Sequence, residues 1–525
     1  MSEPKRAIIR KMSEAHLRVD TDRATEMDIK DFFTYKAAGY RFHPKYKAGL
    51  WNGDISLYNS RTRVLPSGLK SHLYGLFEKL NIRVELMENP KFTEIDDENQ
   101  ITLDEVEQFM YDLDITLPNG AKPREYQIEA VYEAIKAKRI SLKSPTSSGK
   151  SMILYAIIRW ILDQNPHAKI MLMVPTVALV NQMLSDFREY SEKNGWDVDR
   201  HMHGLFSGQA KDLSKSILVT TWQSLSSIAK DPNRGAKVFA IYNAVLVDEC
   251  HTAKAKEIQS ILEYCTNASY RIGTTGTFDD TKVHELMIVG LLGPIYTVIT
   301  TKELMESGQV SDLKIKAIVL KYPEWVRKAA KKTKNQKKMD YPTEFKFVSE
   351  LEHRNQFIVN LCNRAEGASL ILCIRKETQA KVIYEMLKET STKPTYYVSG
   401  DVSPADKETI RKLANKSDCN IVATLQTMST GVSIPNIRNV VFASPFKSSI
   451  KVLQSIGRGL RLFNGKTGMK LFDIIDDFSS GTGVNFSYDH GTKRLEIYRN
   501  EEFDVTVTEV PFNVPDPGDG RGILE

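Results

Sequence analysis

The chain has 525 residues, of which 41% are hydrophobic and 26% are charged, and its formal net charge is +6. This length is enough for about three domains, and the composition is that of an ordinary soluble globular protein. The five cysteines show neither a close CxxC pair nor metal-ligand spacing, which predicts reduced thiols in a cytoplasmic chain. No uninterrupted apolar stretch could span a bilayer, so no membrane partner is expected. The mild positive charge is compatible with nucleic acid without requiring it.

Residues 1–84 interleave aromatic and basic side chains in short segments divided by glycines, which predicts a small α+β domain. Two interpretations stay open: the rings form the core under a solvated basic shell, or the basic face contacts nucleic-acid phosphates. The candidate DNA contacts are Arg41, Lys45 and Lys47. Residues 85–120 then form a predicted acidic linker, because eleven acidic residues and a single basic one lie between Glu85 and Asp114.

The segment Ser144-Pro-Thr-Ser-Ser-Gly-Lys-Ser151 lies between a β-prone stretch and an apolar helical run. Strand, small-residue turn and helix are the context of a phosphate-binding loop, whose backbone N–H groups face an anion. Lys150 is expected to reach the β- and γ-phosphates, Ser151 to hold Mg²⁺, and Gln127, one helix earlier, to meet the edge of an adenine. The predicted nucleotide-binding residues are Arg124, Gln127, Pro145, Thr146, Ser147, Ser148, Gly149, Lys150 and Ser151.

A second Gly-Lys-Thr tripeptide, at residues 465–467, follows Asn464 and has no strand before it, so we interpret it as a turn. After the first loop, apolar strands alternate with amphipathic helices over residues 121–310. This alternation predicts a parallel sheet covered on both faces. Four residues at predicted strand ends are candidate nucleic-acid backbone contacts: Pro175, Thr176, Thr220 and Thr221.

Asp248 and Glu249 end a hydrophobic strand of this sheet and are followed by His251. The carboxyl ends of parallel strands share the edge where the phosphate loop lies. We therefore predict that Asp248 holds Mg²⁺ and that Glu249 orients and deprotonates the attacking water. The competing interpretation is an acidic N-cap of a helix. The next strand ends in residues 273–277, Gly-Thr-Thr-Gly-Thr, whose hydroxyls are candidates for relaying the state of the nucleotide.

Residues 311–350 are predicted to connect the two lobes and contain a basic run at 328–338, which is either a solvated loop or a DNA contact. Residues 351–480 alternate strands and helices again but have no phosphate loop, and residues 481–525 form a predicted C-terminal extension. Thr430 and Gly431 are further candidate DNA contacts. A helix near 449–461 presents Gln454, Arg458 and Arg461 on one face. Two arginines from a lobe without a nucleotide site are typical of arginine fingers, and a salt-bridged surface helix is the alternative.

Taken in order, these motifs resemble those of superfamily 2 helicases, and within that superfamily the chain most resembles a phage recombination helicase. The resemblance rests on Gln127, the phosphate loop, residues 248–251, residues 273–277, Thr430-Gly431 and the Gln454–Arg461 helix. It also includes Gly39-Tyr-Arg-Phe-His-Pro-Lys-Tyr-Lys near the N-terminus. Two departures are Ser147, where many relatives have glycine, and the Gly-Thr-Thr-Gly-Thr form of the third motif.

The resemblance implies two RecA-like lobes, ATP and Mg²⁺ as cofactors, and branched or duplex DNA, including R-loops, as substrate. It implies a role in recombination and repair in the cytoplasm of an infected host cell. A monomer is expected, and phage recombination proteins are candidate partners. Two alternatives remain: an RNA-directed helicase, because the motifs contact the backbone, and a nucleic-acid-binding scaffold with a weak ATPase.

Overall fold

The computed structural model divides into two compact units, one made almost entirely of residues up to Ile299 and the other of residues from Thr300 onward. The structure describes residues 5–37, 39–87, 100–117, 120–205, 215–278, 282–329, 340–428, 434–463, 466, 468–479 and 483–516.

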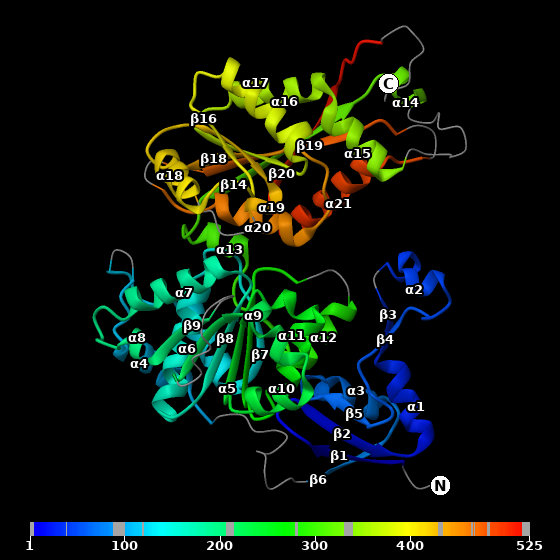
Figure 1. Ribbon diagram of the computed structural model, residues 1–525, viewed down its shortest axis with the longest axis vertical. Coiled ribbons are helices and arrows are strands. Elements are labelled where there is room, and N and C mark those ends of the chain that lie inside the picture. The colour runs from blue at the N-terminus through cyan, green and yellow to red at the C-terminus, as the bar shows by residue number, and fades with distance from the viewer. Residues whose placement is uncertain are drawn as a thin grey trace. The chain divides into compact units, whose positions relative to one another are not determined.

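The N-terminal domain is a four-stranded sheet in the order β5-β2-β1-β6, with α1 and α3 on one side of it (Figure 1). Strand β1 is antiparallel to β2 and parallel to β6. Phe33 and Tyr58 are buried in its core together with Leu286 and Val289 from residues 282–292, so this core is continuous with the lobe that follows. The elements are β1 (Arg6–Lys11), β2 (His16–Thr21), α1 (Arg23–Phe32), β5 (Val64–Pro66), α3 (Lys70–Lys79) and β6 (Arg83–Met87).

A smaller module interrupts this domain between α1 and β5. The two-stranded hairpin of β3 (Thr34–Lys36) and β4 (Asp54–Ser56) carries the short helix α2 (Pro44–Lys47) at its end. The rings of Tyr40 and Tyr46 meet edge to face at 4.9 Å, and an added Cβ at Gly53 would lie 2.4 Å from the Tyr40 ring. The module is therefore held by its own aromatic contacts and by a glycine that lets the chain pass the ring.

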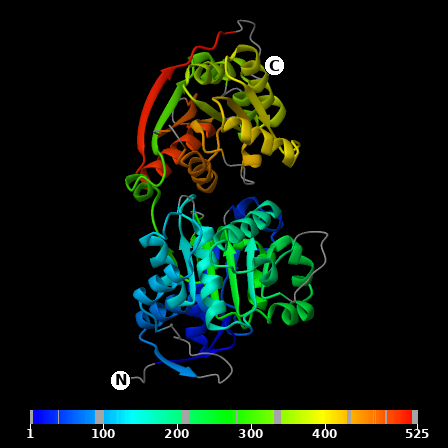
Figure 2. The ribbon, with the colours of Figure 1, turned by 90° about the vertical axis from the view of Figure 1, so that its left-hand side faces the viewer.

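The first lobe is a seven-stranded parallel sheet in the order β13-β7-β12-β11-β8-β10-β9, with helices on both faces (Figure 2). All five residues of β8 are buried, as a strand covered on both faces requires. The main elements are α4 (Leu103–Asp112), α5 (Glu125–Ala137), β7 (Arg139–Lys143), α6 (Lys150–Gln164), β8 (Ile170–Val174), α7 (Val177–Tyr190), β9 (Met202–Leu205), β10 (Ile217–Thr221), α9 (Trp222–Ala229), α10 (Pro232–Phe239), β11 (Ala244–Asp248), α11 (Lys256–Tyr264), β12 (Tyr270–Thr275), α12 (Lys282–Leu292) and β13 (Ile295–Thr297).

Within the predicted acidic linker, α4 packs on the first lobe. It begins with a capping box between Thr102 and Glu105 and buries Val106 and Met110 in the same hydrophobic core as α5 and α6. The acidic side chains lie on the opposite face of an amphipathic helix, which is why composition alone suggested a linker.

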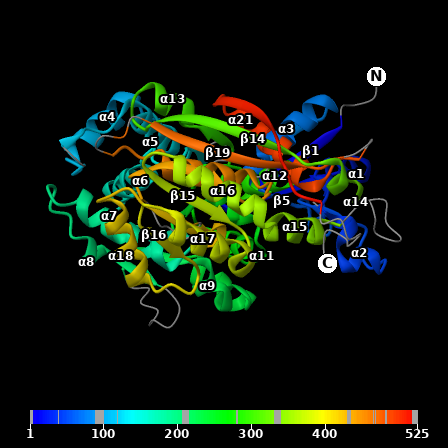
Figure 3. The same cartoon turned by 90° about the horizontal axis from the view of Figure 1, so that it is seen from above.

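The second lobe is another seven-stranded parallel sheet, in the order β16-β17-β15-β18-β19-β14-β20. Figure 3 shows β14 beside the long strand β19. The expected fold class of two RecA-like lobes after a small N-terminal domain is confirmed. The main elements are α13 (Thr301–Glu306), β14 (Asp312–Lys321), α14 (Glu324–Ala329), α15 (Tyr341–Glu350), α16 (Glu352–Arg364), β15 (Ala368–Cys373), α17 (Val382–Thr390), β16 (Thr395–Val398), α18 (Pro404–Ala414), β17 (Asn420–Thr424), α19 (Leu425–Met428), β18 (Ile437–Phe442), α20 (Ser449–Gly459), β19 (Gly468–Asp477), α21 (Phe486–Asn500) and β20 (Asp504–Pro511).

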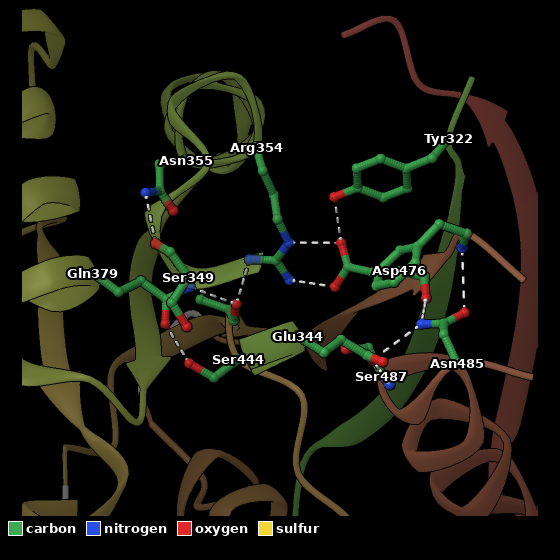
Figure 4. Close-up of polar contacts among 12 residues, drawn as sticks. Tyr322, Glu344, Ser349, Arg354, Asn355, Gln379, Ser444, Asp476, Asn485 and Ser487 are labelled. Atoms are coloured by element: carbon green, nitrogen blue, oxygen red, sulfur yellow. Dashed lines mark hydrogen bonds and ion pairs between the residues drawn. The ribbon is translucent and has the colours of Figure 1, made fainter. Parts of the chain in front are cut away.

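The sheet of the second lobe recruits strands from outside residues 351–480. Strand β14 comes from the predicted inter-lobe segment, and β20 comes from the predicted C-terminal extension. Two buried ion pairs fix β19: Arg354 binds both oxygens of Asp476, at 2.7 and 2.9 Å, and Arg494 binds both oxygens of Asp473. Tyr322 donates a further hydrogen bond to Asp476 (Figure 4).

Candidate active site

The phosphate loop lies between the end of β7 at Lys143 and the start of α6 at Lys150. Two of its residues have left-handed backbone, Ser147 with φ 74° and Gly149 with φ 86°. Glycine adopts this region freely, whereas a side chain makes it unfavourable by about 1–2 kcal/mol. The hydroxyl oxygen of Ser147 is buried and has no hydrogen-bond partner among the described residues. A buried hydroxyl in a turn of this kind fits an anion that would accept a hydrogen bond from it.

Helix α5 supports this loop from behind. The Gln127 side-chain amide donates to the Ser148 carbonyl at 2.8 Å, and the Tyr126 hydroxyl donates to the same carbonyl at 3.0 Å. The Gln127 carbonyl in turn accepts from the Arg124 backbone N–H. An added Cβ at Gly149 would lie 2.3 Å from the Gln127 nitrogen, so only glycine fits here. Gln127, expected at the adenine, here contacts the loop itself.

The first two residues of α6 have protein partners. Lys150 Nζ donates to the Ser144 carbonyl at 3.0 Å, and the Ser151 hydroxyl lies 2.8 Å from the Tyr190 hydroxyl at the end of α7. Both side chains therefore lie at the mouth of the loop, where an arriving phosphate and its cation would compete for them. Nothing in the local sequence pointed to Tyr190, which is 39 residues from its partner.

The paired carboxylates lie at the end of β11, and β12 lies between that strand and β7. Asp248 pairs in register with Thr274, whose hydroxyl donates to Asp248 Oδ1 at 2.8 Å. The Glu249 backbone is left-handed, with φ 51°, and its Oε2 lies 3.2 Å from both the Thr275 hydroxyl and His251 Nδ1. Residues 273–277 thus supply the hydroxyls that orient both acids.

Burial and charge separate the two carboxyl groups. Burial, and then the negative charge of Glu249, raise the pKa of Asp248 above its ordinary value. Burial would also raise the pKa of Glu249, but the hydrogen bond from His251 and the positive charge of Lys150 outweigh it and lower that pKa. Glu249 is therefore the more readily ionised of the two, and a cation that approached Asp248 would lower the raised pKa of that carboxyl.

No group of three or more His, Cys, Asp or Glu side chains within the described residues could hold a metal alone. The available donors are the half-buried carboxylate of Asp248 and the hydroxyl of Ser151. Hard oxygen donors in this number suit Mg²⁺ only when nucleotide phosphates and water complete its coordination. The residues present therefore fit a cation that arrives with a nucleotide.

The other predicted contact residues lie at or just after the ends of strands of the first sheet, on or after α20, or outside the described residues. The Thr176 hydroxyl caps α7, and the Thr221 hydroxyl lies 2.9 Å from Ser224, while Thr220 is buried. Pro175 precedes this cap at the end of β8. Thr430 and Gly431 lie outside the described residues, as does most of the 328–338 run, and only the backbone of Arg458 is described. Gln454 is half-buried on α20, and Arg461 follows that helix.

Lys466, the lysine of the second Gly-Lys-Thr tripeptide, is held by protein carbonyls. Lys466 is buried, and its amine donates to the carbonyls of Pro435, Gly459 and Arg461. Two of these carbonyls belong to the end of α20 or the residues directly after it. Burial lowers the pKa of Lys466 to about 8. This lysine caps a helix C-terminus instead of reaching for a phosphate.

The N-terminal module presents its cations to solvent. Every residue from Arg41 to Leu50 is exposed, including Lys45 and Lys47, and Phe42 is 80% exposed. Phe33 and Tyr58 are therefore core rings, whereas the rings and cations around α2 lie at the surface of the domain.

Three family models match successive parts of the chain. They are "DNA helicase UvsW, N-terminal" over residues 9–86, "Type III restriction enzyme, res subunit" over 120–280 and "Helicase conserved C-terminal domain" over 352–463. The ATP-dependent DNA helicase uvsW of Enterobacteria phage T4 is 32% identical over 513 residues, which cover 94% of this chain and 98% of that protein. The chain belongs to the uvsW family of superfamily 2 helicases. It is an ATP-hydrolysing helicase, as the motif order predicted.

Solved structures are also similar to this chain. The crystal structure of T4 UvsW is 29% identical and covers 97% of this chain and 100% of its own, with a TM-score of 0.49. The Type ISP restriction-modification enzyme LlaBIII bound to DNA has a TM-score of 0.53 at 17% identity, over 74% of this chain and 32% of its own, which shows the fold alone. Among the described residues, no helix is long and apolar enough to cross a membrane.

Proposed function

We propose that this helicase hydrolyses ATP at the phosphate loop and uses the energy to remodel branched DNA. The observation that carries the proposal is the clustering of the loop and the paired acids at one sheet edge: β7 leads into the loop, β11 ends in Asp248, and β12 between them supplies the orienting hydroxyls. A nucleotide phosphate at this edge meets backbone N–H groups, one lysine and one ionised base.

In this proposal Lys150 leaves the Ser144 carbonyl to bind the terminal phosphates, and the Ser147 hydroxyl gains an acceptor. Glu249 is ionised and oriented by Thr275 and His251, so it is suited to align water and take its proton. Ser151 and Asp248 would hold Mg²⁺ that arrives with the nucleotide, and the cation would supply charge neutralisation there. Arg458 and Arg461 of the second lobe are proposed to contribute cationic stabilisation as fingers, and Gln454 of α20 is proposed as a neutral polar contact.

DNA as the substrate follows the name of the T4 relative, which is an ATP-dependent DNA helicase. We assign the first DNA contact to the module around α2, because Arg41, Lys45 and Lys47 are all exposed on it. Such contacts are mainly electrostatic and do not read sequence, which suits a protein that holds the arm of a junction. Recombination intermediates, stalled forks and R-loops are the branched substrates that this arrangement would serve.

The experiment is a comparison of ATPase stimulation by single-stranded, duplex, forked and four-way DNA with stimulation by RNA of matched length. We expect the greatest stimulation from branched DNA. Greater stimulation by RNA would overturn the DNA assignment in favour of an RNA-directed helicase. No stimulation by any nucleic acid would favour a binding scaffold with a weak ATPase.

The role of the α2 module is tested by the combined change Arg41→Ala, Lys45→Ala and Lys47→Ala. Fork affinity should fall, and the slope of log affinity against log salt should decrease by about 0.9 for each lost contact to duplex phosphate. The matched control is Lys79→Ala with Arg83→Ala, two exposed cations elsewhere in the same domain. Equal affinity and slope in the triple variant and the parent would exclude these three residues as the contact.

A further inference from the structure

A cavity of about 760 Å³ lies within the second lobe, apart from the phosphate loop and its acids. Three of its lining residues lie just beyond the carboxyl ends of strands. Ile374 follows β15, Leu425 follows β17, and Phe446 lies four residues beyond β18. The cavity is therefore open at the carboxyl edge of the second sheet, the edge where ligands bind in open parallel sheets. Its size is within the range of small-molecule sites.

Aromatic side chains form much of the wall. Tyr341 is the first residue of α15, and its ring lies 5.7 Å from that of Phe486 and 5.2 Å from the imidazole of His490, both on α21. Phe446 adds a fourth ring from the connection after β18. Tyr341 is 37% exposed, so a flat partner can reach its face. Aromatic faces of this kind bind nucleobases by stacking, with little dependence on the base.

The charged side chains that line the cavity are all positive. Lys447 and Lys451 line it, and its nine lining residues include no acid. Nδ1 of His490 is buried and has no hydrogen-bond partner among the described residues. Burial and then the positive charges of Lys447 and Arg494 lower the pKa of His490 to about 4, so this ring is neutral at pH 7. A neutral imidazole offers one donor and one acceptor to the edge of a base.

Buried polar contacts hold the walls in place. The carboxylate of Glu344 on α15 accepts hydrogen bonds from Asn485 and from the Phe486 and Ser487 backbone N–H groups at the start of α21 (Figure 4). Arg494 donates to the Phe446 carbonyl while it is paired with Asp473. Tyr341, Phe486 and Phe446 are thereby fixed by groups that take no part in the proposed hydrolysis. A site with such supports needs little rearrangement to bind.

We propose that this cavity binds one nucleotide unit of a single strand, with its base stacked on Tyr341 and Phe486 and its phosphate near Lys447 and Lys451. The inference rests on the proposed nucleic-acid motor function and adds a grip on the base to the backbone contacts of the helicase motifs. A base bound in this cavity would keep the strand attached to the second lobe during a cycle of ATP hydrolysis. Free mononucleotides share this chemistry and are the other source of such a ligand.

The test uses the full chain and a thymine oligonucleotide that carries a single 2-aminopurine. Binding by the parent should quench the fluorescence of that base. Tyr341→Leu should lose the quench and weaken binding by about tenfold, the effect of losing one base–aromatic stack. Tyr341→Phe should match the parent, because it keeps the ring. Tyr384→Leu, which alters a ring outside the cavity, is the matched control, and basal ATPase without nucleic acid should be unchanged in all three.

Lys447→Ala with Lys451→Ala should reduce the salt slope for single strands by about 0.7 per lost contact, and Lys412→Ala should not. Unchanged quench, affinity and slope in the variants would overturn the assignment of the cavity while leaving the proposed function intact. Equal affinity for a free 2-aminopurine nucleotide and for the oligonucleotide would assign the cavity to a free nucleotide and overturn the strand contact. Failure of the parent to bind any oligonucleotide would overturn both the cavity assignment and the proposed function.

Discussion

In the first sheet, the carboxylates at the end of β11 face hydroxyl groups and a histidine, whereas in the second sheet Asp473 and Asp476, two fully buried carboxylates of β19, face arginines. Asp248 accepts from Thr274, and Glu249 lies against Thr275 and His251. Asp476, by contrast, takes two hydrogen bonds from Arg354 in a pair whose side chains are completely buried. The two lobes share a topology of parallel strands but differ in how buried charge is balanced.

We interpret this difference as one between the proposed hydrolytic site and a structural ion pair. A fully paired carboxylate such as Asp476 has its charge balanced within the protein and has little left to offer a ligand. Two adjacent acids oriented by hydroxyls keep negative charge available for a cation. Holding two such charges side by side is unfavourable without the cation, and the raised pKa of Asp248 reflects this. For this reason we propose Arg458 and Arg461, and not the paired Arg354 and Arg494, as the second-lobe cations that assist hydrolysis.

The largest effect should come from removing such a cation. Arg458→Ala should slow ATP hydrolysis by about 10³-fold or more and should weaken ATP binding much less, because a finger acts on charge that develops in the transition state. Single-turnover hydrolysis and nucleotide titration separate the two quantities. Arg499→Ala, an exposed arginine on α21, is the control. A normal rate in both Arg458→Ala and Arg461→Ala would place these side chains on a solvated face.

Breaking a structural pair should instead reduce stability. Arg354→Met leaves Asp476 buried and without its bidentate partner, which should lower the free energy of unfolding by about 3–5 kcal/mol. Urea unfolding followed by hydrogen exchange in β19 peptides measures this loss in the second lobe. The double change Arg354→Met with Asp476→Leu should recover much of it. A loss below about 1 kcal/mol in the single variant would contradict the structural role of this pair.

Neutralising an acid in the first lobe should act in the opposite direction. Asp248→Asn keeps an oxygen for the Thr274 hydroxyl but removes a buried charge beside Glu249, so the apo protein should gain about 1 kcal/mol of stability. Hydrogen exchange in β11 and β12 peptides without nucleotide measures the gain. The same variant should lose hydrolysis. Clear destabilisation of the first lobe by Asp248→Asn would contradict the comparison between the lobes.

The smallest effect concerns pH. Because the pKa of Asp248 is raised in the folded state, its proton stabilises the fold at low pH, and this contribution is lost as pH rises through the folded pKa. The stability advantage of Asp248→Asn over the parent should therefore be small near pH 5 and larger near pH 8. Paired unfolding curves at the two pH values check the sign. An advantage that shrinks with rising pH would mean that Asp248 is stabilised as a carboxylate in the apo protein.

The parts of the site that sequence could predict are those joined by short chain segments. A strand, a small-residue turn and a helix within about 25 residues identified the phosphate loop, and a hydrophobic strand ending in Asp248-Glu249 identified the acids. The β20 strand was overlooked within the predicted C-terminal extension, although Asp504-Val-Thr-Val-Thr alternates polar and apolar residues as a strand should. Its pairing with β14, nearly 200 residues earlier, has no local signal.

Contacts between distant residues could not be predicted for the same reason. Ser151 and Tyr190 meet only after α6 and α7 pack together, and Tyr341 and Phe486 meet only when α15 and α21 flank the second sheet. No spacing in one sequence encodes such pairs. The module around α2 was ambiguous because cations and rings alternate there, and only exposure separates core Phe33 from surface Phe42.

The central claim, that Glu249 is the base of the hydrolytic site, is tested most directly by Glu249→Gln. Glutamine keeps the size of the side chain and an oxygen for the Thr275 hydroxyl but cannot take a proton from water at neutral pH. ATP affinity and DNA-stimulated hydrolysis should be measured on the same preparation. We predict near-parental affinity with hydrolysis reduced by about 10²–10⁴-fold. Near-parental turnover in Glu249→Gln would contradict the account.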